Sequence, residues 1–374
     1  MFIKEIELKN FRNHKNTFVK FSPGTNILLG ANAQGKTNLL EAIYLTAIGR
    51  GWRASKDKEM ITFGEGSSTI ITKTQKRFGT LEINIKLNEK SKKSISINKL
   101  PISKVGELMG NVNCVFFSPN ELRMIKDAPA DRRRFLDIDI SQIDKAYFYA
   151  LLRYEKILSQ RNAFLKNIST EDDIRSLEIW DKQLIDVGAF IIEKRISFIN
   201  KLSPLIVIAH NKLTNSQENI TFSYVCVCIG NKEKVINIST NIIDTLKFQL
   251  NNARENDIRL KTTTIGPHRD DIKIEINGND VRRFGSQGQQ RTASLSIKLA
   301  ELKLFELETG ETPILLLDDV FSELDETRQT SLLNYIQSVH SIITTTELPK
   351  TCFPDNYNII RLPLYSQQTH QKRH

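Results

Sequence analysis

Cysteine is scarce in this chain, with four residues among 374. No two of them have the Cys-x-x-Cys spacing that zinc sites commonly use, and four thiols are too few for a dense disulfide framework. The four positions are Cys114, Cys226, Cys228 and Cys352. The sequence therefore argues against a zinc domain of that type and against a small secreted scaffold, and a reducing cytoplasm fits.

Long apolar runs are also missing. No stretch approaches the ~20 residues that a membrane-spanning helix needs. Residues 1–7 (MFIKEIE) mix apolar and charged side chains, which predicts a strand rather than a secretion signal. The chain has no internal repeat and no low-complexity tract. We therefore expect a cytoplasmic protein that does not enter a membrane.

Acidic residues are outnumbered by basic ones, 43 against 53, which gives a formal net charge of +10 and a pI near 9.3. This balance suits a polyanionic partner such as DNA, although lysine-rich proteins are basic for other reasons too. One group of lysines is clustered: Lys86, Lys90, Lys92, Lys93 and Lys99. For this group, DNA contact and a solvated strand edge are equally good interpretations.

The most specific motif is a glycine-rich loop of the form G-x-x-x-x-G-K-[ST]. It consists of Gly30, Ala31, Asn32, Ala33, Gln34, Gly35, Lys36 and Thr37. The apolar run 27–29 predicts a strand before it, and apolar residues at helical spacing over 39–47 predict a helix after it. In this context backbone N–H groups cradle phosphate, Lys36 reaches the β- and γ-phosphates, and the Thr37 hydroxyl binds Mg²⁺. The sequence therefore predicts a nucleoside triphosphate site.

A second motif bears on whether the nucleotide is hydrolysed. The apolar run 313–317 ends in Asp318 and Asp319. Such a run predicts a buried parallel strand, and ligands bind at the carboxyl ends of these strands. We expect Asp318 to hold Mg²⁺. We expect Asp319 to be the catalytic base that activates water, with Lys36 as the other catalytic residue.

Between these motifs, residues 284–292 (FGSQGQQRT) precede a predicted helix. Their core of Ser286, Gly288 and Gln289 resembles the signature motif of ABC-type ATPases, and residues 322–325 resemble the D-loop of that class. The resemblance implies that the core binds the nucleotide held by a second subunit, so that ATP joins two copies of the chain. Taken alone, the string fits an ordinary helix N-cap equally well.

The spacing of the motifs predicts the domain organisation. Lys36 and Asp318 are 282 residues apart, more than one α/β domain requires. We assign residues 1–118 and 265–374 to an α/β P-loop head of the ABC-ATPase type, discontinuous in sequence. We assign residues 119–264 to an inserted, mainly α-helical lobe, because apolar residues recur at helical spacing on both sides of a break at 167–170.

Several longer strings, in order along essentially the whole chain, resemble the RecF family of bacterial recombinational repair proteins. Besides the three motifs above, they are residues 8–13 (LKNFRN), 118–122 (SPNEL), 129–137 (PADRRRFLD), 266–271 (GPHRDD) and 317–325 (LDDVFSELD). The combination is highly specific, although each short string is not. One departure is Asp127, where the family commonly has glycine. Since aspartate tolerates turns, we expect no loss of function.

The resemblance implies an ATP-dependent DNA-binding protein with a head of the SMC/Rad50 type. Such heads dimerise around two ATP molecules, clamp DNA, and release it through weak, DNA-stimulated hydrolysis. The resemblance further implies action on single-stranded, duplex and gapped DNA, at gaps and at junctions of single and double strands. It implies that RecR and RecO type mediators are partners in loading recombinase, and that the protein supports replication restart and SOS induction.

By the same resemblance, Arg12 contacts the nucleotide phosphates, and residues 120–122 lie near the Q-loop position of other heads. Transporter ATPases have a γ-phosphate-sensing histidine where this chain has threonines 344–346, so we expect slow turnover. For the arginine run 132–134 we favour a structural or ATP-coupling role over DNA contact. For His268 we expect hydrogen bonds to the neighbouring carboxylates.

Two other functions stay open. One is a transporter-type ABC ATPase subunit, against which the 282-residue separation and the arginine motif argue. Stimulation by DNA rather than by a membrane protein would distinguish the two. The other is a binding-only module in which the nucleotide is a structural ligand. The intact pair Asp318 and Asp319 argues against it, and measurable hydrolysis would exclude it.

Overall fold

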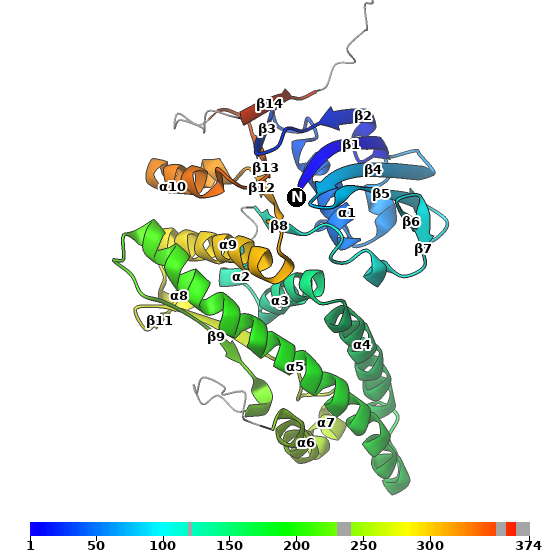
Figure 1. Ribbon diagram of the computed structural model, residues 1–374. Coiled ribbons are helices and arrows are strands. Elements are labelled where there is room, and N and C mark those ends of the chain that lie inside the picture. The colour runs from blue at the N-terminus through cyan, green and yellow to red at the C-terminus, as the bar shows by residue number, and fades with distance from the viewer. Residues whose placement is uncertain (119–121, 230–240, 349–356, 364–374) are drawn as a thin grey trace, which may run out of the picture. The chain divides into compact units, whose positions relative to one another are not determined.

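The computed structural model describes residues 1–118, 122–229, 241–348 and 357–363 (Figure 1). The chain forms two compact units, Met1–Asn120 with Phe305–His374, and Glu121–Leu304. The second unit therefore contains residues 265–304, which the motif order had assigned to the head. Strand pairing gives the reason, because β10 (Asp271–Ile276) pairs along its whole length with β9 (Ile220–Val225) from the predicted lobe.

The first unit contains a five-stranded sheet in which every pairing is parallel. Its strands, in spatial order, are β14 (Tyr357–Arg361), β3 (Thr25–Leu29), β13 (Ser341–Thr345), β12 (Ile314–Asp318) and β8 (Cys114–Phe117). β8, β12 and β13 are buried at every residue, as a continuous apolar run predicts. Since the strands are parallel, the segments that follow β3, β12 and β13 meet at one edge of the sheet.

An antiparallel sheet and the helix α1 (Lys36–Ile48) complete the core of this unit. The strands, in spatial order, are β2 (His14–Lys20), β1 (Phe2–Phe11), β4 (Ser67–Lys76), β5 (Gly79–Asn88), β6 (Ser94–Ile97) and β7 (Leu100–Ile102). Burial alternates along β4, so one face of the sheet is core, and α1 is buried between strands of both sheets. The shorter elements are η1 (Asp57–Met60), η2 (Val105–Glu107), η5 (Val320–Glu323) and α10 (Glu326–Ile336).

The second unit is mainly helical. Its helices are α2 (Leu122–Lys126), α3 (Pro129–Ile143), α4 (Lys145–Leu165), α5 (Glu171–Thr214), η4 (Val227–Ile229), α6 (Ile242–Asn252), α7 (Arg254–Leu260), α8 (Val281–Phe284) and most of α9 (Gln287–Thr309). A small sheet orders β11 (Asn279–Asp280), β10 and β9. One face of this sheet, α3, α5 and α9 share a hydrophobic core.

α4 and α5 form the helical hairpin that the periodicity predicts (Figure 1). The Asp144 side chain caps α4, and Thr170 forms a reciprocal capping box with Asp173 at the start of α5. The predicted break at 167–170 is thereby confirmed as the hairpin turn. α5 then runs for 44 residues through Pro204, well beyond the periodic apolar run.

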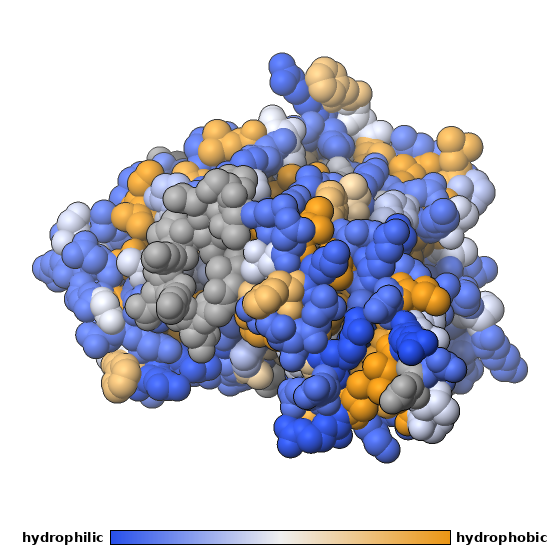
Figure 2. All heavy atoms as spheres, turned by 90° about the horizontal axis from the view of Figure 1, so that it is seen from below, coloured by the Kyte–Doolittle hydropathy of each residue, from blue (hydrophilic) through white to orange (hydrophobic). Residues whose placement is uncertain are grey.

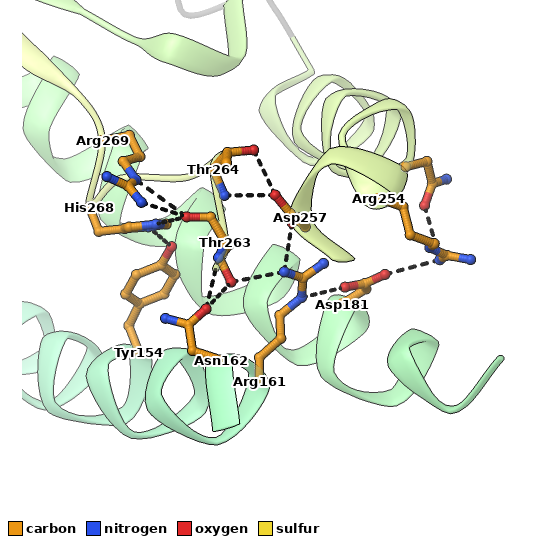
Figure 3. Close-up of polar contacts among 11 residues, drawn as sticks. Tyr154, Arg161, Asn162, Asp181, Arg254, Asp257, Thr263, Thr264, His268 and Arg269 are labelled. Carbon is orange, nitrogen blue, oxygen red and sulfur yellow. Dashed lines mark hydrogen bonds and ion pairs between the residues drawn. The ribbon is translucent and has the colours of Figure 1, made fainter. Parts of the chain in front are cut away.

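A buried arginine, Arg161, joins several segments of the second unit through hydrogen bonds (Figure 3). Its guanidinium donates to Asp181 Oδ1 over 2.8 Å, to Asp257 Oδ2 over 2.7 Å and to Thr263 Oγ1 over 2.8 Å. Arg254 donates to the second Asp181 oxygen over 3.0 Å. These bonds join α4, α5, α7 and the segment before β10, and the pairing offsets the desolvation of each charge.

The arginine run and the GPHRDD motif brace each other. Arg132 donates to both oxygens of Asp271, over 2.6 and 3.0 Å, and Arg133 donates to the Asp270 carbonyl over 2.8 Å.

The prediction that His268 forms hydrogen bonds to the neighbouring carboxylates is wrong. Its ring nitrogens lie 2.8 Å from Tyr154 Oη and 3.0 Å from the carbonyl oxygen of residue 263, and burial lowers its pKa to about 4 (Figure 3). His268 is therefore a neutral packing residue.

Hydrophilic residues cover most of the face shown in Figure 2, and hydrophobic residues lie between them in separate patches. Within the described ranges, no helix combines the length and the apolar character that crossing a bilayer requires.

We expect Arg161→Leu to lower the free energy of unfolding by about 3–5 kcal/mol, because Asp181 and Asp257 would lose a buried counter-charge. Urea unfolding followed by circular dichroism measures the change. The matched control is Arg175→Leu, which breaks an exposed pair with Asp172 and should have little effect. Equal stabilities of the two variants would contradict the role given to Arg161.

Candidate nucleotide site

The glycine-rich loop connects the end of β3 to the first residue of α1. Gly35 has φ 96°, and a Cβ there would lie 2.7 Å from His14 Nε2 and 2.8 Å from the Asn13 side chain. A Cβ on Gly30 would lie 2.7 Å from the Leu362 carbonyl oxygen. Both positions therefore require glycine, the first for its left-handed backbone as well as for space. The loop residues between them are exposed or partly exposed: Ala31, Asn32, Ala33 and Gln34.

Lys36 turns its side chain into this loop. Its ammonium group donates to the carbonyl oxygens of Gly30 and Ala31, over 2.5 and 2.9 Å. Burial lowers the pKa of Lys36, and the negative charges of Asp319 and Asp318 act in the opposite direction. The cation thus lies inside the loop, on the side of the two acidic residues.

Asp318 joins three segments at the carboxyl edge of the parallel sheet. Its Oδ1 accepts from Thr37 Oγ1 over 2.8 Å and from Thr344 Oγ1 over 2.8 Å. Its Oδ2 lies 3.5 Å from Arg53 Nη2. Thr37 and Asp318, predicted separately from distant motifs, are therefore in direct contact.

A hydroxyl and a carboxylate are the hard oxygen donors that Mg²⁺ prefers. Among the described residues, no group of three or more His, Cys, Asp or Glu side chains is placed to hold a metal ion. At a phosphate site, Mg²⁺ usually takes one or two protein ligands and completes its shell with phosphate oxygens and water. Thr37 and Asp318 are the residues that would hold it.

Asp319 occupies a left-handed turn, with φ 53°, directly after β12. Its backbone N–H donates to Thr344 Oγ1 over 2.9 Å, and its carbonyl oxygen accepts from Ser322 Oγ over 2.7 Å. Aspartate tolerates this conformation better than most residues.

Arg12 is held by a buried acid. Its Nε donates to Glu41 Oε2 over 2.9 Å, and its Nη1 donates to the Glu59 carbonyl over 2.8 Å. Glu41 is fully buried on α1, one turn after Thr37, and its other oxygen accepts the backbone N–H of Arg53 over 3.2 Å. Glu41 thereby fixes the two arginines that lie near the loop.

The signature loop belongs to the second unit. Ser286 N–H donates to Gln289 Oε1 over 2.9 Å, and Gln289 N–H donates to Ser286 Oγ over 3.2 Å. Gly288 has no side chain, and its carbonyl oxygen accepts a hydrogen bond from Thr292 Oγ1 over 2.8 Å. The loop is a reciprocally capped helix start, the interpretation that its string alone left open. Of the segment 120–122, residues 120 and 121 lie outside the described ranges.

Comparison with known proteins places this geometry in a family. A family model described as the RecF/RecN/SMC N terminal domain matches residues 2–361. The DNA replication and repair protein RecF of Alkaliphilus oremlandii is 45% identical over 348 residues, which cover 92% of this chain and 93% of that protein. The chain belongs to the RecF family. RecF of Agathobacter rectalis is 44% identical and covers 93% of each chain.

Solved structures agree with this membership. The recombination mediator protein RecF-ATPrS of the RecFOR pathway is 39% identical, with a TM-score of 0.87 and 96% of each chain covered. The RecF-ATP structure is 40% identical, with a TM-score of 0.86, and covers 94% of this chain and 93% of that one. The Smc head of Pyrococcus furiosus, at 16% identity and a TM-score of 0.52, shares the fold. The predicted fold class, an ABC-type α/β head with a mainly helical second lobe, is confirmed.

The contacts of three residues beside the RecF-family motifs were missed from the sequence. Thr344 was noted only as standing near the place of a sensing histidine, and its contact with Asp318 across the neighbouring strands was not predicted. Glu41 is an acid on an otherwise apolar helix stretch, which is also a signal because buried acids need partners. Arg53 lies in an irregular segment whose path no pattern predicts.

We expect Thr344→Val to weaken magnesium-dependent nucleotide binding or turnover about tenfold, because it removes the hydroxyl that links Asp318 to the Asp319 backbone. Titration of a fluorescent ATP analogue with and without Mg²⁺ measures binding, and phosphate release measures turnover. Thr345→Val is the matched control, since its hydroxyl donates to the Glu347 carbonyl over 2.6 Å and not to Asp318. A Thr344→Val protein that behaves like this control would contradict the assignment.

Proposed function

We propose that this RecF-family chain is an ATP-dependent DNA-binding protein of recombinational repair and replication restart. The observation that carries the proposal is the contact of Thr37 with Asp318 over 2.8 Å beside the glycine-rich loop, which supplies the phosphate and metal halves of one site. Relatives named DNA replication and repair protein RecF, and the RecF-ATP structure, support the choice of ATP and of DNA.

In this proposal residues 30–37 bind the triphosphate of ATP, and Arg12 adds a phosphate contact. Bound Mg²⁺ would neutralise phosphate charge, and Thr37 and Asp318 are placed to hold it. Asp319 accepts a proton from the attacking water. Lys36 exchanges its carbonyl partners for phosphate oxygens, which fixes the group that is transferred.

We expect slow hydrolysis because threonines 344–346 stand where transporter ATPases have a γ-phosphate-sensing histidine. The Thr344 hydroxyl donates to Asp318 and accepts from the Asp319 N–H, so it is already engaged by the acidic pair. A weak, DNA-stimulated ATPase of this kind works as a switch, because the ATP-bound state persists. We assign the chemical step to Asp319 and Lys36.

The signature residues Ser286, Gly288 and Gln289 act on the nucleotide of a second copy, so that ATP joins a homodimer around DNA. Exposed backbone at the start of a helix is a suitable anion site. The RecFOR name of the similar structures supports RecR and RecO type partners. The net charge of +10 supports binding to single-stranded, duplex and gapped DNA. In this proposal the protein acts in the cytoplasm and contributes to SOS induction.

The proposal is tested by binding of gapped, duplex and single-stranded DNA with and without ATP and Mg²⁺, at two salt concentrations, with sedimentation in parallel. We expect ATP both to dimerise the protein and to tighten salt-sensitive DNA binding. Lys36→Ala should abolish both effects, because the phosphate loses its cation. Lys15→Ala removes an exposed lysine of the same unit and should change neither. DNA binding that ignores ATP would refute the proposed switch.

We expect Asp319→Asn to trap an ATP-bound dimer on DNA, because the amide keeps the shape of the carboxylate and cannot accept the proton from water. Dissociation of labelled DNA after dilution should be at least about tenfold slower than in the parent protein. Glu326→Gln makes the same chemical change at an exposed position nearby and serves as the control. Dissociation at the parent rate would remove Asp319 from the catalytic role.

A further inference from the structure

The signature loop has a side-chain anchor outside its own motif. Gln289 Nε2 donates to Glu218 Oε1 over 2.9 Å. The orientation of this amide is settled by its other end, because Oε1 accepts the N–H of Ser286 over 2.9 Å. One side chain therefore bridges the loop backbone and a carboxylate 71 residues earlier in the chain.

The position of Glu218 does not depend on this bond. It lies in the connection between α5 and β9, and the next residue, Asn219, is pinned to the turn between β10 and β11. Asn219 N–H donates to Asn277 Oδ1 over 2.9 Å, and Asn277 N–H donates to the Asn219 carbonyl over 2.8 Å. The backbone thus presents Glu218 to Gln289 from a fixed support.

A buried histidine lies beside the second oxygen of Glu218. His210, fully buried near the end of α5, has Nε2 3.3 Å from Glu218 Oε2 and Nδ1 3.0 Å from Ser296 Oγ. Ser296 donates its only hydroxyl proton to the Thr292 carbonyl over 2.7 Å, so it accepts from Nδ1. The contact with Glu218 is an ion pair only when Nε2 also carries a proton, and in this geometry Nε2 makes no hydrogen bond. Burial lowers the pKa of His210, and the Glu218 charge opposes that shift.

We propose that Glu218 is a positioning residue for the signature loop, which it connects through Gln289 to the end of the long helix α5. The inference rests on the proposed function, in which this loop meets the nucleotide of a second copy. Without the carboxylate, the Gln289 amide loses its charged acceptor and Ser286 loses a fixed partner. Glu218 touches no nucleotide in this account and acts only through Gln289.

The test compares nucleotide binding, which uses the chain's own P-loop, with dimerisation and hydrolysis, which use the signature loop of a second copy. Glu218→Ala should leave the affinity of the P-loop for a fluorescent ATP analogue unchanged. It should weaken ATP-dependent dimerisation about tenfold, and lower kcat about tenfold with little change in KM. Glu218→Gln keeps an oxygen for Gln289 Nε2 and should recover most of the loss. Gln217→Ala, at the exposed neighbouring position, is the matched control and should match the parent.

Each outcome decides the proposal. Parent-like dimerisation and kcat in folded Glu218→Ala would overturn it while leaving the proposed function standing. A parent protein that stays monomeric with ATP would overturn both. If Glu218→Ala does not fold, Glu218→Asp, which keeps the charge but withdraws it from Gln289, carries the test in the same assays. Failure of both variants to fold would make Glu218 a structural residue and overturn the positioning role.

Discussion

The carboxylate of Asp318 lies at the end of a fully buried strand and receives contacts from Thr37, Thr344 and Arg53. A buried anion is expensive unless donors surround it, so the segments that carry these donors are held where they are. Thr37 is the second residue of α1, and Thr344 lies one residue before the end of β13. The Asp318 carboxylate therefore links the start of the first helix, two neighbouring strands of the parallel sheet and the predicted metal site.

The Asp318 charge also acts on Lys36 of the glycine-rich loop. Lys36 lies near two carboxylates and donates to two carbonyls of its own loop, which is a closed arrangement of the cation. In the proposed function, a triphosphate brings more negative charge than Asp318 and Asp319 together and so competes for Lys36 and for Arg53. Binding would then exchange contacts within the chain for contacts with phosphate. This exchange links nucleotide binding to the order of the segments that those contacts hold.

How far the sequence predicts this protein depends on the range of the interactions involved. Short-range patterns are reliable: the glycine loop between strand and helix, the buried strand before Asp318, and the break between α4 and α5 all lie where the residues indicate. The partners Tyr154 of His268, Arg12 of Glu41 and Asp318 of Arg53 were not predicted, because they come from distant segments of the chain. The extent of the second unit was not predicted either, since β10 finds its pairing partner across the proposed boundary.

The second unit uses buried arginines where the first uses a buried aspartate. Arg161 and Arg132 fix the two ends of the segment that leads into β10, and the chain then passes through β11 and α8 to the signature loop. At the end of α8, Gly285 donates to the Val281 carbonyl over 3.1 Å, and a Cβ on Gly285 would lie 2.5 Å from that oxygen. The signature loop is thus held at its start by the close packing of Gly285 against Val281, and through the side chain of Gln289 by Glu218. Because both supports belong to one compact unit, a displacement of α5 that moves Glu218 has to be absorbed either by the Gln289 bond or by the loop itself. A hydrogen bond to a carboxylate is about twice as strong as a neutral one, so in the proposed positioning role the loop moves with Glu218.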